Sequence, residues 1–307
     1  MECSAGEKGI YYLCVTMQTD TLYVTDLDGT LLDTDSRVSE RSAQIITDLV
    51  CDGAMITVAT ARTPATVEEL LRDTHTTLPA IVLTGAAMWD RGRRRYRYPL
   101  FLEDADAAAV LAEFRQADVH PFIYTLRADG ILHVYHNGPM VKPAEEFMRE
   151  RSNLELKKFH IDDPAIECAA SVPSTVLYFA MGKAERVYPL AERLRNLVDC
   201  AVYAYLDIFN PDVAVIEVFG ANVSKASAIK QLARRAGAKR IMVFGDSTND
   251  LPMMEIADVA VAVENAIPEV KRAASLVIGR NSSDAVARFI YNDYYSEETP
   301  VYRKVNG

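Results

Sequence analysis

Residues 21–32 read TLYVTDLDGTLL, and the fold class can be inferred outward from them. The first five of these residues are aliphatic, aromatic or β-branched, which predicts a buried strand that runs directly into Asp26 and Asp28. Open α/β sheets bind their ligands at the carboxyl ends of parallel strands. We therefore expect both carboxylates to belong to a ligand site.

Two other interpretations of this stretch compete with a ligand site in an α/β protein. An EF-hand calcium loop counted from Asp26 needs glycine at its sixth position and glutamate at its twelfth, where the sequence has Leu31 and Arg37. The calcium loop is therefore excluded. An exposed acidic turn stays open for this motif taken alone, because short motifs also arise by chance.

Strands and helices alternate from residue 21 to about residue 92. Further strands are expected at 55–59 and 81–84, and Ser39 and Thr63 are placed to begin the intervening helices. This βαβαβ order predicts a parallel sheet covered by helices. The fold class is therefore α/β, with a Rossmann-like core.

The middle of the chain interrupts that order. Residues 93–210 mix strand-like and helical runs, which predicts an inserted α+β unit, and the core order returns with VAVIEVF at 213–219. In chain order, the expected parts are an N-terminal extension (1–20), the core (21–92 and 211–290) around the insertion (93–210), and a C-terminal tail (291–307).

A second acidic loop follows the expected strand at 241–244. It reads GDSTND at 245–250 and places Asp246 and Asp250 at another carboxyl end of the core sheet. Converging carboxylates raise each other's pKa values and destabilise a fold unless a cation lies between them. Hard oxygen ligands favour Mg²⁺ as that cation.

With these motifs the sequence resembles the haloacid dehalogenase (HAD) superfamily of aspartate-dependent phosphotransferases, and within it the Cof-type phosphatases with a type IIB cap. The four motifs of the family occur in order: DLDGTLL at 26–32, Thr60 before Ala61-Arg62, Lys225 in VSK at 223–225, and GDSTND at 245–250. The resemblance implies that residues 93–210 are the cap domain, inserted into a Rossmann-like core.

The resemblance also implies a role for each motif residue. Asp26 would be the nucleophile that forms an aspartyl-phosphate, and Asp28 the acid–base residue. Mg²⁺ would be bound by Asp26, the backbone carbonyl of Asp28 and Asp246, with Asp250 supporting the metal from outside its ligand set. The phosphate-binding residues that it implies are Thr60, Lys225 and Asn249.

The sequence departs from the family pattern at four positions. Ala61, Ala226 and Ala285 stand where the family usually has glycine, and Thr84 stands where it often has asparagine. An alanine whose backbone requires a positive φ costs about 1 kcal/mol. The backbone conformation at these four positions therefore shows whether the loops keep the conformation that is usual in the family.

The composition limits the partners and the compartment. The chain carries 43 acidic and 33 basic residues, a net charge of −10, and a field of this sign repels nucleic acids and anionic membranes. Its longest nearly apolar stretch, residues 80–89, is far shorter than the ~20 residues of a membrane span. Five cysteines without a C-x-x-C pair fit a reducing cytoplasm. We expect a cytoplasmic monomer or weak homodimer without a nucleic-acid or membrane partner.

Two further groups of residues have structural interpretations. His133 and His136 are three residues apart in an expected strand, so they point to opposite faces and are interpreted as packed or solvent-facing residues, not as a metal pair. The segment 91–97 holds five arginines and is interpreted as a solvated hairpin turn. Contact with an anionic substrate is the alternative for these arginines.

The function that the sequence predicts is a Mg²⁺-dependent phosphatase of small phosphorylated metabolites, with sugar or polyol phosphates favoured. A phosphomutase of the same superfamily and a catalytically silent metabolite-binding regulator remain as alternatives. The four motifs handle only the phosphoryl group and the metal, so we expect cap loops to contact the leaving group. The candidates for that contact are Arg127, Asp129 and Asn210.

Overall fold

The computed structural model describes residues 20–163, 174–207 and 210–296, and β1 lies in the middle of its core sheet. The five strands of this sheet have the order β14-β13-β12-β1-β2, and all neighbours are parallel. Their bounds are β1 (Thr21–Thr25), β2 (Met55–Val58), β12 (Arg240–Gly245), β13 (Val259–Val263) and β14 (Leu276–Ile278). The expected parallel core is confirmed.

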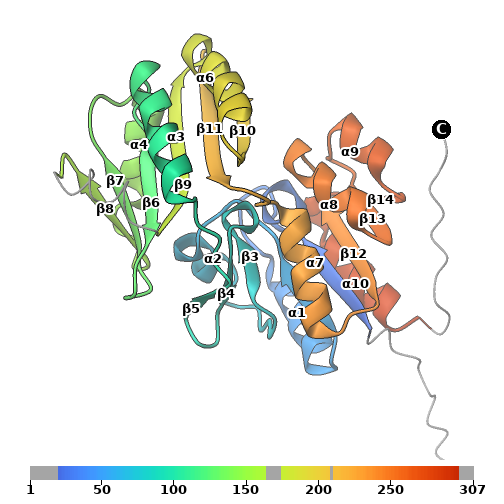
Figure 1. The fold of residues 1–307 in the computed structure, drawn as a ribbon. Coiled ribbons are helices and arrows are strands. Elements are labelled where there is room, and N and C mark those ends of the chain that lie inside the picture. Colours follow the sequence, from blue (N-terminus) through green and yellow to red (C-terminus); the bar gives the residue numbers. More distant parts are fainter. Residues whose placement is uncertain (1–19, 164–173, 208–209, 297–307) are drawn as a thin grey trace, which may run out of the picture.

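Two groups of helices accompany the core sheet (Figure 1). In one group α1 (Glu40–Cys51) packs against α10 (Ala285–Tyr294), and in the other α8 (Leu251–Ile256) packs against both α7 (Lys225–Ala236) and α9 (Pro268–Ala273). The short helix α2 (Pro64–Leu70) follows β2. Ser39 caps α1 as expected, because its hydroxyl accepts a 3.0 Å hydrogen bond from the backbone N–H of Ser42.

A small three-stranded sheet extends the core beside β2. It consists of β3 (Ala80–Val82), β4 (Ala87–Asp90) and β5 (Arg95–Arg97), and the pairing of Ala59 with Ile81 joins it to the end of β2. The segment 91–97 is a hairpin, as the sequence predicts. Arg91 is an exception to its solvated character, because its guanidinium donates to the carbonyls of Leu71 and Thr74 at 2.6 and 2.9 Å.

The second lobe is built on a six-stranded sheet of order β10-β11-β9-β6-β7-β8 (Figure 1). Its strands are β6 (Phe122–Leu126), β7 (Leu132–His136), β8 (Lys157–Ile161), β9 (Thr175–Lys183), β10 (Cys200–Leu206) and β11 (Val213–Gly220). Its helices are α3 (Asp104–Gln116), α4 (Lys142–Arg151) and α6 (Ala184–Leu197). An inserted α+β unit is therefore confirmed.

Side-chain alternation gives this sheet two different faces. Tyr178 and Ala180 of β9 belong to a cluster with α3 and α6, whereas Leu177 and Phe179 belong to a cluster with α4 and with Leu83 of the core. The second face is thus the one that looks toward the core lobe.

The strand β11 does not return to the core, contrary to the expectation for residues 213–219. It pairs with β10 and β9, so the expected boundary at residue 210 falls within the six-stranded sheet. A continuous apolar run is compatible with the middle of either sheet, so periodicity cannot assign it to one of them. The chain leaves and re-enters the core side by side, because a Cβ on Gly220 would lie only 2.5 Å from the carbonyl oxygen of Phe101.

The expected C-terminal tail also needs correction, because α10 continues to Tyr294. Asp293 and Tyr294 are buried in the core lobe, where Asp293 accepts a 2.7 Å hydrogen bond from the Tyr23 hydroxyl. The polar and aromatic sequence of this segment resembles a surface tail, and only its contacts with β1 show otherwise. Residues 1–19 of the expected N-terminal extension and residues 297–307 lie outside the described residues.

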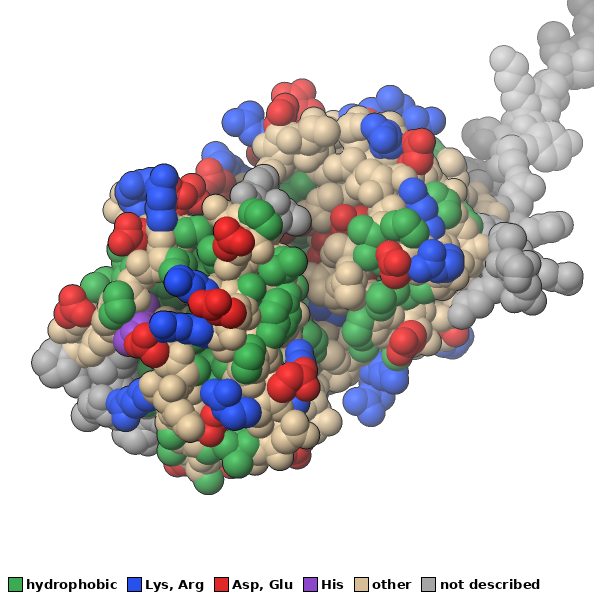
Figure 2. All heavy atoms as spheres, turned by 90° about the horizontal axis from the view of Figure 1, so that it is seen from above, with side chains coloured by type: hydrophobic (Ala, Val, Ile, Leu, Met, Phe, Trp, Pro, Cys, Tyr) green, Lys and Arg blue, Asp and Glu red, His purple; other side chains and the backbone are tan. Residues whose placement is uncertain are grey.

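Figure 2 shows charged side chains of both signs over the surface of the two lobes. Acidic side chains are also visible in the hollow between the lobes. Within the described part of the chain, no helix has both the length and the apolar character of a membrane span.

Gly85 is the position where we expect a single methyl group to disrupt the core. Its φ is +99°, and a Cβ there would lie 2.2 Å from the carbonyl oxygen of Ser224, the residue that caps α7. Gly85→Ala should lower the free energy of unfolding by more than about 2 kcal/mol, measured by urea denaturation. Gly130→Ala is the matched control, because its φ is +76° with no atom within 4 Å of a Cβ, and should cost about 1 kcal/mol. Equal losses in the two variants would contradict the close contact.

Candidate active site

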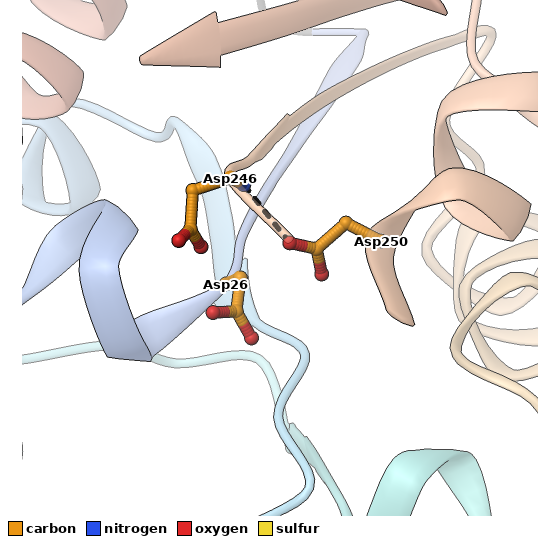
Figure 3. A group of neighbouring side chains, drawn as sticks. All are labelled: Asp26, Asp246 and Asp250. Atoms are coloured by element: carbon orange, nitrogen blue, oxygen red, sulfur yellow. Dashed lines mark hydrogen bonds between the residues drawn. The ribbon is translucent and has the colours of Figure 1, made fainter. Parts of the chain in front are cut away.

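Three acidic side chains converge at the carboxyl ends of β1 and β12 (Figure 3). Asp26 directly follows β1, and its backbone N–H donates a 2.9 Å hydrogen bond to the carbonyl of Phe244 in β12. Carboxylate oxygens of Asp26, Asp246 and Asp250 all lie within 4.8 Å of one another. The parallel register of the two strands therefore brings the two acidic loops together, as the sequence predicts.

Lys225 supplies the positive charge at the centre of this group. It is the first residue of α7, and its ammonium lies 2.6 Å from Asp26 Oδ1 and 2.8 Å from Asp250 Oδ1. Only 1% of the Lys225 surface is exposed. Burial by itself lowers the pKa of Lys225, but the two carboxylates outweigh burial and the net shift is upward. The ammonium is therefore charged in the folded protein.

Asp250 organises the loop that carries Asp246. Its second oxygen accepts hydrogen bonds from the backbone N–H groups of Asp246 and Ser247, at 2.9 and 3.1 Å. The dashed line in Figure 3 marks the first of these. Both oxygens of Asp250 are thus engaged by the protein, which fits a position beside a metal ion more than a direct ligand. That role stays a prediction.

Asp28 is not part of the group of three carboxylates and is paired with Arg62. The Arg62 guanidinium donates to both carboxylate oxygens of Asp28, at 2.8 Å from Nε and 2.5 Å from Nη2. Asp28 is about half exposed, at 53% of its side chain. Arg62 belongs to a sequence motif, but the sequence does not indicate a role for its side chain. The Asp28–Arg62 pair joins two loops that are far apart in the chain, so no local pattern reveals it.

The three expected phosphate-binding residues follow β2, begin α7 and lie in the loop after β12. Thr60 follows β2 and is buried, with its hydroxyl accepting from the backbone N–H of Arg62 at 3.1 Å. Asn249 is exposed in the turn Thr248–Asp250, and its side-chain oxygen accepts from the Ser247 hydroxyl at 2.8 Å. With Lys225, these residues offer hydroxyl, amide and ammonium donors at one edge of the sheet. Their contact with phosphate stays a prediction.

Backbone strain occurs at one of the four positions that depart from the family pattern. Thr84 has a φ of +56°, whereas Ala61, Ala226 and Ala285 are absent from the described non-glycine residues with positive φ. The alanines therefore carry no left-handed strain. Asparagine tolerates the left-handed region better than threonine does. Of the four departures, therefore, only Thr84 carries a conformational cost of this kind.

The electrostatics of the cluster favour a bound cation. Burial raises the pKa of Asp26 to about 7, although Lys225 opposes the shift, and burial also raises the pKa of Asp246 to about 6. One ammonium thus faces three clustered carboxylates. A set of hard carboxylate oxygens in excess negative charge fits a hard divalent metal ion.

A cavity of about 250 Å³ lies between the core and the inserted lobe, and its lining includes Asp28, two residues after Asp26. On the core side it is lined by Asp28, Arg62 and Leu83 among others, and on the opposite side by residues that include Tyr124, Lys157, Phe179 and Glu217. Most of the latter lie in strands, on the sheet face that looks toward the core. The inserted lobe therefore covers the site.

The loop residues expected to contact a leaving group do not line this cavity. Arg127 donates to the Tyr135 hydroxyl, the Asp129 carboxylate bonds to His133 at 2.9 Å, and Asn210 bonds to Asp207. That expectation was wrong for this cavity, because polar loop residues were favoured over strand residues. The signal that could have found Glu217 is a single charge inside the apolar run VAVIEVF.

The two histidines of β7 are both packed and do not form a pair. His133 bonds to His160 at 2.8 Å and to Asp129, whereas His136 bonds to the carbonyl of Pro121 at 3.2 Å. Both are buried. Their interpretation as packed residues is confirmed.

Comparisons with known proteins agree with this geometry. The family model for haloacid dehalogenase-like hydrolases matches residues 23–290. The chain is 28% identical over 280 residues to 5-amino-6-(5-phospho-D-ribitylamino)uracil phosphatase YitU of Bacillus subtilis, with 90% of this chain and 97% of that protein covered. It is also 28% identical over 273 residues to HMP-PP phosphatase of Serratia proteamaculans, with 86% and 92% covered. The solved structure of BT4131, described as a HAD subclass IIB sugar phosphatase, superimposes with a TM-score of 0.67 at 19% identity, covering 90% of this chain and 99% of that one.

In the metal-free protein we expect the free energy of unfolding to fall as the pH rises from about 4 to about 7. The pKa values of Asp26 and Asp246 are raised from 3.8 to about 7 and about 6, so the folded state holds protons that the unfolded state releases. Their stabilisation is complete below 3.8, the ordinary pKa, and is lost as the pH passes through the folded values. Urea unfolding in the presence of a chelator at several pH values measures this dependence.

Two variants control for other titrating groups. Asp246→Asn removes one raised carboxylate and should flatten the pH dependence, whereas Asp73→Asn, at an exposed position, should keep the slope of the unchanged protein. A free energy of unfolding that rises over the same pH range would show that the cluster is not electrostatically strained.

Proposed function

This chain belongs to the haloacid dehalogenase-like hydrolase family, and on that premise we propose that it is a Mg²⁺-dependent phosphatase of small phosphorylated metabolites, sugar or polyol phosphates above all. The observation that carries the proposal is the buried contact of Asp26 with Lys225 beside Asp246, two residues before Asp28, which lines the covered cavity. In this proposal Asp26 is the carboxylate nucleophile, and Lys225 is one of the cationic groups that receive the phosphoryl group.

The first half of the reaction transfers the phosphoryl group to Asp26. A carboxylate oxygen of Asp26 attacks phosphorus in line, a new P–O bond forms, and the bond to the leaving oxygen breaks. Asp28 donates a proton to that oxygen, so the leaving group departs as a neutral alcohol. For this step the Asp28 carboxyl must exchange its contact with Arg62 for the leaving oxygen.

The second half releases phosphate. A water molecule attacks the aspartyl-phosphate, the P–O bond to Asp26 breaks, and Asp28 takes the proton of the water, which restores both carboxyl groups to their starting states. Lys225, Thr60 and Asn249 hold the phosphoryl oxygens during both steps. The residues that would hold Mg²⁺ are Asp26, the Asp28 carbonyl and Asp246, and the bound ion would neutralise charge that develops on the phosphoryl oxygens.

The size of the cavity supports a small substrate. A cavity of about 250 Å³ accommodates a compact metabolite. The named relatives point the same way, because the name of the Bacillus subtilis relative contains a phosphorylated ribityl group, which is a polyol chain.

We expect Asp26→Asn to reduce phosphatase turnover to less than about 1% of that of the unchanged protein, because a neutral amide is a poor nucleophile. The assay is release of inorganic phosphate from a panel of phosphomonoesters in Mg²⁺, with activity lost in a chelator and restored by Mg²⁺. Asp35→Asn, on the exposed loop after the same motif, is the matched control and should keep full activity. Activity of more than a few per cent in Asp26→Asn would exclude the covalent mechanism.

Substrate preference should follow the inserted lobe. We expect compact sugar and polyol phosphates to be hydrolysed in preference to phosphopeptides and nucleic-acid ends. Replacing the segment between Phe101 and Gly220, where the chain leaves and re-enters the core, by the cap of another family member should change the ranking of substrates and keep the requirement for Asp26. An unchanged ranking after this exchange would place selectivity in the core loops. Transfer of the phosphoryl group to a second hydroxyl instead of water would identify a phosphomutase.

A further inference from the structure

Lys157 is a buried cation in the cavity wall. It is the first residue of β8, and 5% of its surface is exposed. Its ammonium makes no hydrogen bond or ion pair with any residue that the structure describes. Its ammonium lies 5.3 Å from the centre of the Tyr124 ring and 5.8 Å from that of Phe147. Burial lowers the pKa of Lys157 to about 7, because nearby groups do not make up for the water that the ammonium loses.

Glu217 is the matching anion on the same wall. It lies in the middle of β11, on the same face as Val215 and Phe219, and 8% of its surface is exposed. Burial raises its pKa to about 7, and its carboxylate has no hydrogen-bond partner among the described residues. No described residue forms a hydrogen bond or an ion pair with this carboxylate, and the charge that opposes the effect of burial on its pKa is the more distant Lys225 ammonium.

The other charges of the cavity wall are already compensated. Asp28 is paired with Arg62, and Arg151 contacts Glu150 at 3.0 Å. Lys157 and Glu217 both line the cavity but do not form an ion pair with each other. Among the described residues neither charge has an ion-pair partner, so each carries a desolvation cost, which a ligand that bonds to both would recover.

We infer that Lys157 and Glu217 recognise hydroxyl groups on the uncharged, polyhydroxylated part of the substrate. The Lys157 ammonium donates to one hydroxyl oxygen, and the Glu217 carboxylate accepts from another hydroxyl. The C–H groups of the same chain or ring pack against the aromatic side chains Tyr124, Phe147 and Phe179. This inference rests on the proposed phosphatase function and assigns the specificity of the same site to two residues.

Two other leaving groups fit the wall less well. A second anionic group would gain from Lys157 but would be repelled by Glu217. A purely apolar group would leave both charges buried and without hydrogen bonds. A hydroxyl group both donates and accepts, so a chain with neighbouring hydroxyls satisfies the two residues at once.

The first test uses the unchanged protein in Mg²⁺ with matched pairs of substrates. Glycerol 1-phosphate, erythritol 4-phosphate, ribitol 5-phosphate and sorbitol 6-phosphate are each compared with the n-alkyl phosphate of equal carbon number, and fructose 1,6-bisphosphate supplies a second anion. We expect kcat/KM for the best polyol phosphate to exceed that of its alkyl partner by about 100-fold, and to exceed that of the bisphosphate.

The second test repeats the best pair with Lys157→Met and Glu217→Gln. Each variant should lower kcat/KM for the polyol phosphate about 10- to 100-fold more than for the alkyl phosphate, because only the polyol loses hydrogen bonds. Lys158→Met and Glu145→Gln are the controls: Lys158 is the exposed neighbour of Lys157 in β8, and Glu145 is exposed on α4. Both controls should keep the preference of the unchanged protein.

Four results would overturn the inference. Equal losses on the polyol and alkyl phosphates would show that the two residues act on the fold, and a bisphosphate preference that Glu217→Gln increases would show an anionic leaving group. Equal rates for polyol and alkyl phosphates in the unchanged protein would overturn the inference even if neither variant folds. This result would leave the phosphatase proposal intact. Failure to hydrolyse any phosphomonoester would overturn both proposals.

Discussion

The contact of one buried ammonium with two carboxylates is the interaction on which the site depends. Lys225 lies between Asp26 and Asp250, and each of these three residues comes from a different segment of the core. Asp250 in turn holds the backbone of the loop that carries Asp246. Because a buried charge without a partner is costly, this contact requires the ends of β1 and β12 and the start of α7 to meet at one place. The parallel sheet and the capped helix are the structural means of bringing them together.

Chemistry and selectivity are divided between the two lobes. The core supplies the carboxylates, Lys225 and Thr60, and in the proposed reaction it would handle the phosphoryl group, which is the same in every phosphomonoester. The inserted lobe contributes one face of a sheet, on which alternate residues of each strand point toward the core. Lys157 and Glu217 stand on that face, so under the proposed function substitutions there are expected to change the substrate preference without disturbing the acidic cluster.

Much of the fold and the candidate site was predictable because the signals are local. Thr21–Thr25 is a strand, Ser39 caps a helix, and Asp26 and Asp246 follow neighbouring parallel strands, all of which can be seen in short stretches of sequence. Predictions failed where a segment has no local signature of its partner. The run at 213–219 joins the other sheet, and the polar aromatic end of α10 is buried through Asp293 and Tyr294.

The amino-acid sequence by itself determined the class of the core, the presence of an insertion and the identity of the acidic residues, because hydrophobic periodicity and motif spacing act within a few residues. Only the tertiary structure decided that Arg62 holds Asp28, that Thr84 carries the left-handed backbone, and that Lys157 and Glu217 face the same cavity. Pairing of a strand edge, burial of a charge and the lining of a cavity depend on residues distant in the chain. Their positions follow from the packing of the two lobes, which no single stretch of sequence contains.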